Sequence, residues 1–211
     1  KLDLLRNPTI RKIAETAGVR FRGSLLMVAE LEGKDLQGVN LQNAKLMGAN
    51  LSKADLRAAN LQGVTFTIGN LEGACLEGAD ISSAQLIGCT GTEANFWRAN
   101  LKESLLGLSS LSYSDFRDTC LEGSSLLAAD LSGGQLQNAN LEGADLREAK
   151  LQEAQLQEAS LEGANLEGTD LRWANLRDYK GTPAERRDCI LSPDTYLQSG
   201  WTPEQLLEWY N

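Results

Sequence analysis

Large apolar residues recur at every fifth position over most of the chain. From Phe21 to Leu176 the step of five visits 32 positions, and each is Leu, Phe or Ile except Gly91. The residue two places earlier is nearly always small, as at Ala44, and Asp or Asn often stands directly before the large residue, as at Asn50. Gly often stands two places after it. The chain therefore repeats one five-residue unit.

A five-residue period fits neither an α-helix nor a flat β-strand. On a helix, successive Leu residues would lie ~140° apart and would cover every face. In a strand, an odd step would send successive Leu residues to opposite faces of the sheet. Repetition at a short fixed period is typical of a solenoid, in which each unit forms one side of a coil and points its large and small residues inwards. The Asp, Asn and Gly positions suit the corners, where turns need local hydrogen bonds or a permissive backbone.

Two stretches carry the repeat without interruption. Residues 49–58 read ANLSKADLRA, and residues 139–148 read ANLEGADLRE. They resemble the pentapeptide repeat family, whose unit is A-(D/N)-L-x-x, and the style is similar to that of cyanobacterial members. The resemblance implies an all-β solenoid, a right-handed quadrilateral β-helix of about eight coils with short helical caps at one or both ends. At the ~4.8 Å spacing of neighbouring strands, eight coils would make a rod roughly 38 Å long.

Both ends of the chain depart from the repeat, and a solenoid needs caps there because its terminal coils expose apolar core and open strand edges. Residues 1–18 are predicted to form an N-terminal helical cap, with Asn7 as the N-cap, Pro8 at the first helical position and Gly18 at the end. Residues 19–178 are the predicted β-helix.

Residues 179–211 are predicted to be a C-terminal connector and capping helix. The residues Thr202-Pro-Glu-Gln205 form a capping box that opens this helix. Trp201, Trp209 and Tyr210 would either make a dimer contact or dock the cap on its own rod, and we expect the second.

The missed position at Gly91 predicts a packing defect that is repaired locally. A Leu-to-small change in a core costs ~2–5 kcal/mol, depending on how far the site collapses. The count of five resumes at Phe96, so the coil is expected to keep its register. We expect residues 90–92 to bulge or sink, and Phe96 and Cys89 to fill much of the lost volume.

Composition excludes most catalytic chemistry. The sequence has no His, which makes Ser-His and Cys-His catalysis impossible. Its four cysteines form no CxxC pair, which favours reduced thiols in a cytoplasmic protein. Asp35, Asp55 and Asp115 share a column but lack the repeated Gly-Asp pattern of calcium-binding β-rolls. We expect no catalytic residues, no cofactor and no metal, and the chain is not expected to be an enzyme.

Nothing in the sequence predicts a membrane protein. No apolar run approaches the ~20 residues of a membrane span, and no signal peptide is recognisable. The chain begins at Lys1 rather than Met, so a targeting segment missing from this sequence would change the predicted cytoplasmic location.

With four sides per coil, residues 20 apart should stack into columns, and one side of the rod then collects apolar residues at its outward positions. These residues are Met27, Met47, Ile87, Leu105, Leu108 and Leu127. An exposed apolar band on a soluble rod is typical of a contact surface. Two interpretations stay open: a partner binds the band, or an N-terminal segment or the C-terminal connector of the same chain covers it.

A second column is acidic and continues from Lys102 through Glu122, Glu142 and Glu162. Stacked carboxylates ~4.8 Å apart repel each other by ~1 kcal/mol per pair in water. Such a ladder could mimic phosphates, but a solvated surface that keeps β-rich rods apart is the simpler interpretation.

Two functions therefore remain. The first is a non-enzymatic, rigid protein-interaction scaffold with an unknown protein partner, present as a monomer or homodimer. The second is a DNA mimic that binds or protects DNA gyrase or topoisomerase, which the family resemblance brings in because some members protect topoisomerases. The net charge of −9 argues against direct binding of nucleic acid.

Overall fold

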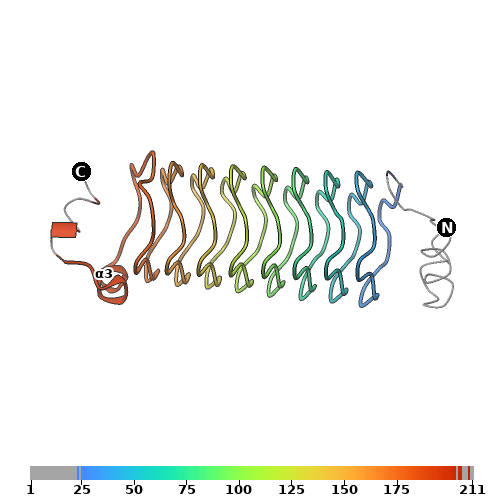
Figure 1. The fold of residues 1–211 in the computed structure, drawn as a ribbon, viewed down its shortest axis with the longest axis horizontal. Helices are drawn as coiled ribbons and strands as arrows, with labels where there is room; N and C mark the ends of the chain where they lie inside the picture. Colours follow the sequence, from blue (N-terminus) through green and yellow to red (C-terminus); the bar gives the residue numbers. More distant parts are fainter. Residues whose placement is uncertain (1–22, 24, 203, 206–208, 210–211) are drawn as a thin grey trace.

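The computed structural model describes residues 23, 25–202, 204–205 and 209, and it shows a rod of stacked coils (Figure 1). Parallel bridges join each coil to the next, and the two partners are always 20 residues apart, from Leu25↔Lys45 to Asp170↔Ile190. The register does not slip over this span. Because a coil holds four five-residue units, the solenoid has four sides, and residues 20 apart stack into columns.

Each corner is a tight turn that starts at the large inward residue. The N–H of Ala44, for example, donates to the carbonyl of Leu41 at 2.8 Å. The third residue of the turn has a positive φ at every fifth position from 23 to 178, which explains why Gly recurs two places after the large residue. Most of these positions hold other residues, even the β-branched Ile68 at φ 56°. The hydrogen bonds to the next coil therefore impose this conformation.

Asp and Asn residues stabilise the same corners, as the repeat pattern predicts. The Oδ1 of Asn40 accepts the N–H of Gln42, two residues later, at 3.1 Å. Four Asp residues make this bond and also bind the guanidinium of the Arg at that position: Asp55, Asp115, Asp145 and Asp170. Each of these corners thus satisfies a backbone donor with a local side chain.

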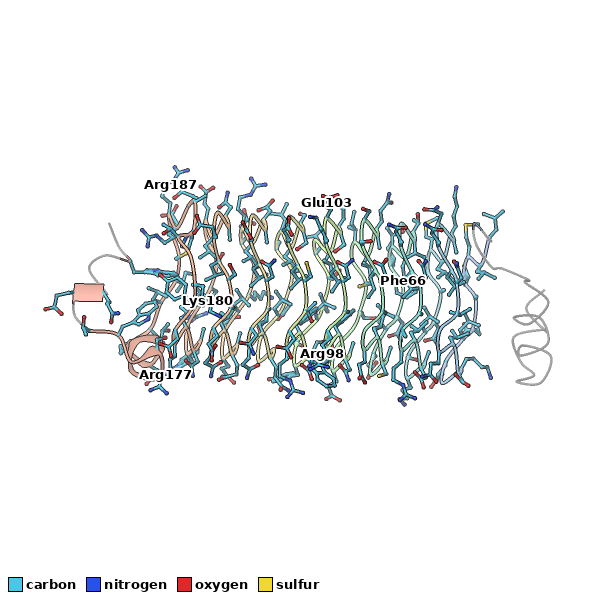
Figure 2. All side chains as sticks on the ribbon, in the orientation of Figure 1. Phe66, Arg98, Glu103, Arg177, Lys180 and Arg187 are labelled. Carbon is cyan, nitrogen blue, oxygen red and sulfur yellow. The ribbon has the colours of Figure 1, made fainter. Side chains whose placement is uncertain are left out.

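The interior of the rod is filled by the large residues and by the small residues two places before them. From Leu26 to Leu176 the large residues are at most 5% exposed. Figure 2 shows Phe66 within the rod, whereas Arg98 and Glu103 point outwards at opposite edges. The rings of Phe96 and Phe116 stack in successive coils, with centroids 4.7 Å apart and planes 4° from parallel.

Hydroxyl side chains replace Ala at five successive inward positions in the middle of the rod: Ser104, Ser109, Ser114, Thr119 and Ser124. All five are at most 1% exposed, and each hydroxyl donates to a backbone carbonyl at 2.6–2.7 Å. Buried hydroxyls are tolerated when they are hydrogen-bonded in this way.

The coil at Gly91 keeps its register, as expected, but it does not bulge. The N–H of Gly91 donates to Ser110 at 2.7 Å and its carbonyl accepts from Ala94 at 3.0 Å, as at other corners. A Cβ placed on Gly91 would lie 2.8 Å from Cδ2 of Leu111 and 3.6 Å from Cβ of Leu71. The prediction of a local bulge was therefore wrong. The side chains nearest the missing Cβ are those of Leu111, Leu71 and Ala94, rather than Phe96 and Cys89, which were expected to fill the space.

The coil path continues beyond residue 178, where the pattern of Leu residues ends. Lys180, Glu185 and Ile190 form bridges to the preceding coil. Backbone pairing needs no Leu, and Tyr179, Cys189 and Leu191 supply apolar contacts to the core instead. The N-terminal cap predicted for residues 1–18 lies outside the described residues.

Helix α3, Pro193–Ser199, lies at the C-terminal end of the stack (Figure 1). At this edge, hydroxyl oxygens replace the carbonyls that a further coil would supply. The N–H of Trp173 donates to Ser192 and Thr195, each at 3.0 Å, and the N–H of Leu176 donates to Ser199 at 2.9 Å. The open edge is thus satisfied by side chains.

The capping box predicted at Thr202 is confirmed by two reciprocal bonds. The N–H of Thr202 donates to Gln205 Oε1 at 2.8 Å, and the N–H of Gln205 donates to Thr202 Oγ1 at 3.3 Å. Trp209 is 4% exposed, and its ring contacts Tyr179 and Trp201 with centroids 5.5 and 5.1 Å away. These contacts to the rod agree with docking of the C-terminal segment on its own chain. Tyr210 lies outside the described residues.

Candidate functional site

The predicted apolar band lies on one side of the rod, and its side chains are exposed. We call this surface the apolar side: the outward residues 25, 27 and 28 and those that stack on them at intervals of 20, up to residues 125, 127 and 128. All six predicted residues lie on it, with exposed fractions between 37% and 68%: Met27, Met47, Ile87, Leu105, Leu108 and Leu127. Leu25, Val28 and Ile68 are exposed there too, each by at least 70%.

Most of the exposed large apolar residues lie on this side. Nine of the twelve exposed large apolar residues in the described part of the chain lie on it, and the other three are Tyr113, Trp173 and Ile190. Only one of its eighteen outward positions is charged, namely Lys45. The next coil ends the surface, because Asp145 and Arg147 pair there at 2.8 Å beside Glu148. The apolar side is therefore bounded and nearly uncharged.

Large and small residues alternate along the apolar side. One column of the apolar side consists of residues with positive φ. Its large residues, in the first, third and fifth coils, are Val28, Ile68 and Leu108. Its small residues, in the second, fourth and sixth coils, are Gly48, Gly88 and Ala128. The neighbouring column reads Met27, Met47, Thr67, Ile87, Gly107 and Leu127, so its large and small residues alternate from the second coil to the sixth. The projecting side chains thus follow a zigzag with hollows between them. Because residues 20 apart stack, this alternation is visible in the sequence, although it was not among the predictions above.

The acidic column is partly neutralised at one end. Lys102 Nζ lies 2.8 Å from Glu122 Oε1, and both side chains are about two-fifths exposed. This pair raises the pKa of Lys102 through the hydrogen bond and the charge of Glu122. At the other end, Glu162 Oε2 accepts the N–H of Thr182 at 2.7 Å. The column exists as predicted, with Glu142 between these two residues, but two of its three carboxylates already have partners.

The aspartates that share a column without a calcium-binding pattern form hydrogen bonds at the corners. Asp55 and Asp115 each bind an Arg two residues on, with Oδ2 to Nη2 distances of 2.5 and 2.6 Å. Among the described residues, no group of three or more His, Cys, Asp or Glu side chains could hold a metal ion.

The half-buried Trp97 and the exposed Trp173 both form hydrogen bonds to neighbours on the rod. Trp97 Nε1 donates to Asp118 at 2.9 Å, and the Arg98 guanidinium lies 4.4 Å from the Trp97 ring centroid. Trp173 Nε1 likewise donates to Asp194 at 2.8 Å. These indoles therefore already use their polar atoms within the chain.

Nothing in the described residues points to catalysis. The four cysteines are free thiols, and burial raises the pKa of Cys89 to about 11 and that of Cys189 to about 12. Such thiols are poor nucleophiles at neutral pH. None of the described helices is long and apolar enough to cross a membrane.

The repeat and its corners define a class of protein, and the family comparison confirms it. Eight copies of the model "Pentapeptide repeats" match between residues 25 and 178, from 25–63 to 139–178. The chain belongs to the pentapeptide repeat family, whose members fold as right-handed quadrilateral β-helices. No curated protein sequence matches the chain.

Solved structures share this fold. Full-length QnrB1, a plasmid-mediated fluoroquinolone resistance protein, is 18% identical, with a TM-score of 0.63 over 89% of this chain and 92% of QnrB1. A trypsin-treated variant of QnrB1 is 19% identical, with a TM-score of 0.59 over 89% of this chain and 90% of that one. HetL, a protein involved in heterocyst differentiation regulation from the cyanobacterium Nostoc sp. strain PCC 7120, is 28% identical over 87% of this chain and 94% of HetL, with a TM-score of 0.39.

Proposed function

We propose that this chain is a non-enzymatic interaction scaffold: a rigid rod that binds a protein partner along the apolar side. In this proposal about eight coils, residues 19–178, follow a helical cap formed by residues 1–18. They precede a C-terminal connector and capping helix, residues 179–211, whose first part continues the coil path to Ile190. The four free cysteines favour the cytoplasm as its location.

The observation that carries the proposal is the exposure of the apolar side. The side chains of Ile68 and Leu108 are 76% and 68% exposed, and no described residue covers them. Contiguous apolar surface of this kind is uncommon on a monomer and marks a binding surface. Charged residues are depleted at the centres of protein interfaces, as they are on this side.

The rod also suits a binding surface because its backbone is held in place at every coil. Met27 and Val28 stand at a turn whose N–H groups donate to the next coil, for example from Val28 to Met47 at 2.9 Å. A preorganised surface loses less conformational entropy on binding than a flexible loop does.

Affinity capture from an extract of the producing organism tests the proposal. The double variant Ile87→Glu/Leu127→Glu should lose the captured partner while its circular dichroism and melting temperature stay near those of the wild type. Glu already occupies the equivalent turn position at Glu72 and Glu122, so the fold accepts it. The control Ser112→Glu/Asn138→Glu adds the same charge on other sides and should retain the partner. Equal capture by both variants would refute the proposal.

The alternative function is a DNA mimic that acts on gyrase. It is favoured by the acidic column and by the fold shared with QnrB1, a fluoroquinolone resistance protein. Because Lys102 pairs with Glu122 and Glu162 bonds to the backbone, the column offers fewer free carboxylates than its sequence implies. We expect no inhibition of gyrase supercoiling at micromolar protein. Inhibition that is lost when Glu122, Glu142 and Glu162 are replaced by Lys would establish the alternative instead.

A further inference from the structure

We propose that the partner bound by the apolar side is a second copy of this chain, so that two rods pair antiparallel through it. This inference rests on the proposed function, in which the apolar side is the contact surface. Three features of that surface point to a second copy: its repeat spacing, its alternation of large and small residues, and its lack of charge.

The repeat spacing restricts the kind of partner that can fit. The coils follow one another without insertion from residue 25 to residue 190, so the columns advance by one strand spacing, ~4.8 Å, per coil. A surface with this regular corrugation interdigitates over its full length only with another surface of the same spacing. A second copy has the same spacing by identity.

The alternation makes the apolar side complementary to itself. A two-fold axis between the third and fourth coils, lying in the interface across the rods, places each column opposite the same column in reverse order. Ile68 then faces Gly88 of the other copy, and Leu108 faces Gly48. In each pair a side chain exposed by at least two-thirds meets a glycine.

The neighbouring column follows the same rule in its four central coils, whereas at its ends Met27 faces Leu127. The same axis places Met47 opposite Gly107 and Ile87 opposite Thr67. Gly88 has open space around the position of a Cβ, with no atom within 4 Å, so a side chain of the second copy has room there. Facing surfaces interdigitate when large residues on one oppose small residues on the other. Any other register that shifts the copies by one coil puts large residues opposite large ones.

The charges are compatible with this pairing. Lys45 is the only charged residue among the eighteen outward positions of the apolar side, and it faces Leu105 at the edge of the contact, so no like charges meet. Asp145, Arg147 and Glu148 lie in the next coil, beyond the paired region. The six coils extend ~29 Å at the strand spacing, about the length of a standard interface but narrower, so we expect a dimer of micromolar affinity.

Sedimentation equilibrium of the full chain tests the association. The wild type should change from monomer to dimer as its concentration rises through the micromolar range. The variant Ile87→Glu/Leu108→Glu should weaken the dimer by ~100-fold or more, because both residues lie near the centre of the contact. The control Ser112→Glu/Asn138→Glu should dimerise as the wild type does. A wild type that stays monomeric up to hundreds of micromolar, or an Ile87→Glu/Leu108→Glu variant that still dimerises, would overturn the inference.

Disulfide trapping tests the register. In a Cys75→Ser/Cys120→Ser background, the pair Gly48→Cys/Leu108→Cys should give covalent dimers on mild oxidation. In the proposed register, the thiol at position 48 of one copy faces the thiol at position 108 of the other. These positions are three coils apart, too far for a bond within one chain. The pair Gly48→Cys/Ala128→Cys should give few dimers, and equal trapping of both pairs would contradict the antiparallel register.

The two proposals fail in different ways. If the wild type is monomeric while the capture experiment still returns another protein that depends on Ile87 and Leu127, the second copy is excluded and the interaction scaffold stands. If the wild type is monomeric and a thiol introduced by Ile87→Cys resists alkylation at every concentration, the chain covers its own apolar side. Both proposals are then wrong.

Discussion

Gly91→Leu restores the missing residue of the repeat, and we expect it to destabilise the protein. Its Cβ would meet Cδ2 of Leu111 at 2.8 Å, well inside contact distance, and three further carbons would have to fit beyond it. Gly91 does not have a positive φ, so the backbone itself accepts Leu and the cost comes from packing. Overpacking of this size costs ~1–3 kcal/mol. For a chain of about this length, that corresponds to a fall in melting temperature of ~2–12 °C.

Calorimetry on the single variants and the paired variant isolates the cause. Leu111→Ala alone removes the side chain that fills the space and should cost ~2–5 kcal/mol. The pair Gly91→Leu/Leu111→Ala should recover at least ~1 kcal/mol relative to the sum of the single variants, because the two side chains compete for one volume. A rise in melting temperature for Gly91→Leu would show that Leu111 leaves a usable hole, and the packing described above would then be wrong.

Two further predictions concern the C-terminal edge and the corners. Thr195→Val should destabilise the protein by ~1–3 kcal/mol and speed hydrogen exchange of the Trp173 amide. The reason is that the buried Thr195 hydroxyl accepts the N–H of Trp173 and donates to the carbonyl of Leu171. Unchanged exchange at Trp173 would contradict this role. The hydrogen bond from Arg147 holds the pKa of Asp145 below its ordinary value of 3.8 against a smaller opposing effect of burial. A carboxyl with a lowered pKa stabilises the folded state above that value and loses the contribution as pH falls through its folded pKa, so Asp145→Asn should flatten the acid limb of a stability–pH curve below about pH 4. An unchanged acid limb would show that the pair contributes nothing.

Much of the fold was predictable because the five-residue repeat determines the geometry of each coil. The five-residue period identified the inward residues, and the Asp, Asn and Gly positions identified the corners, where Asn40 and Asp55 make the expected turn bonds. The apolar side was predictable for the same reason, since a fixed coil of 20 residues turns the sequence into a surface map. Met27 and Leu108 are exposed where that map placed them.

The features that were missed depend on interactions outside the repeat. Which side chain fills the space at Gly91 depends on how the neighbouring Leu111 packs, and a period cannot specify that. Helix α3 and the ladder beyond residue 178 depend on backbone bonds and on hydroxyls such as those of Thr195 and Ser199. These residues have no place in the five-residue pattern.

Photocrosslinking in living cells tests most directly whether the apolar side is a contact surface. A benzophenone amino acid would replace Ile87 on this side or, as the control, Ala58 on the opposite side; both positions are exposed. We expect discrete protein adducts from position 87 and none from position 58, and an adduct of twice the chain mass from position 87 if the partner is a second copy. Absence of adducts at position 87, or the same adducts at both positions, would contradict a binding role for the apolar side.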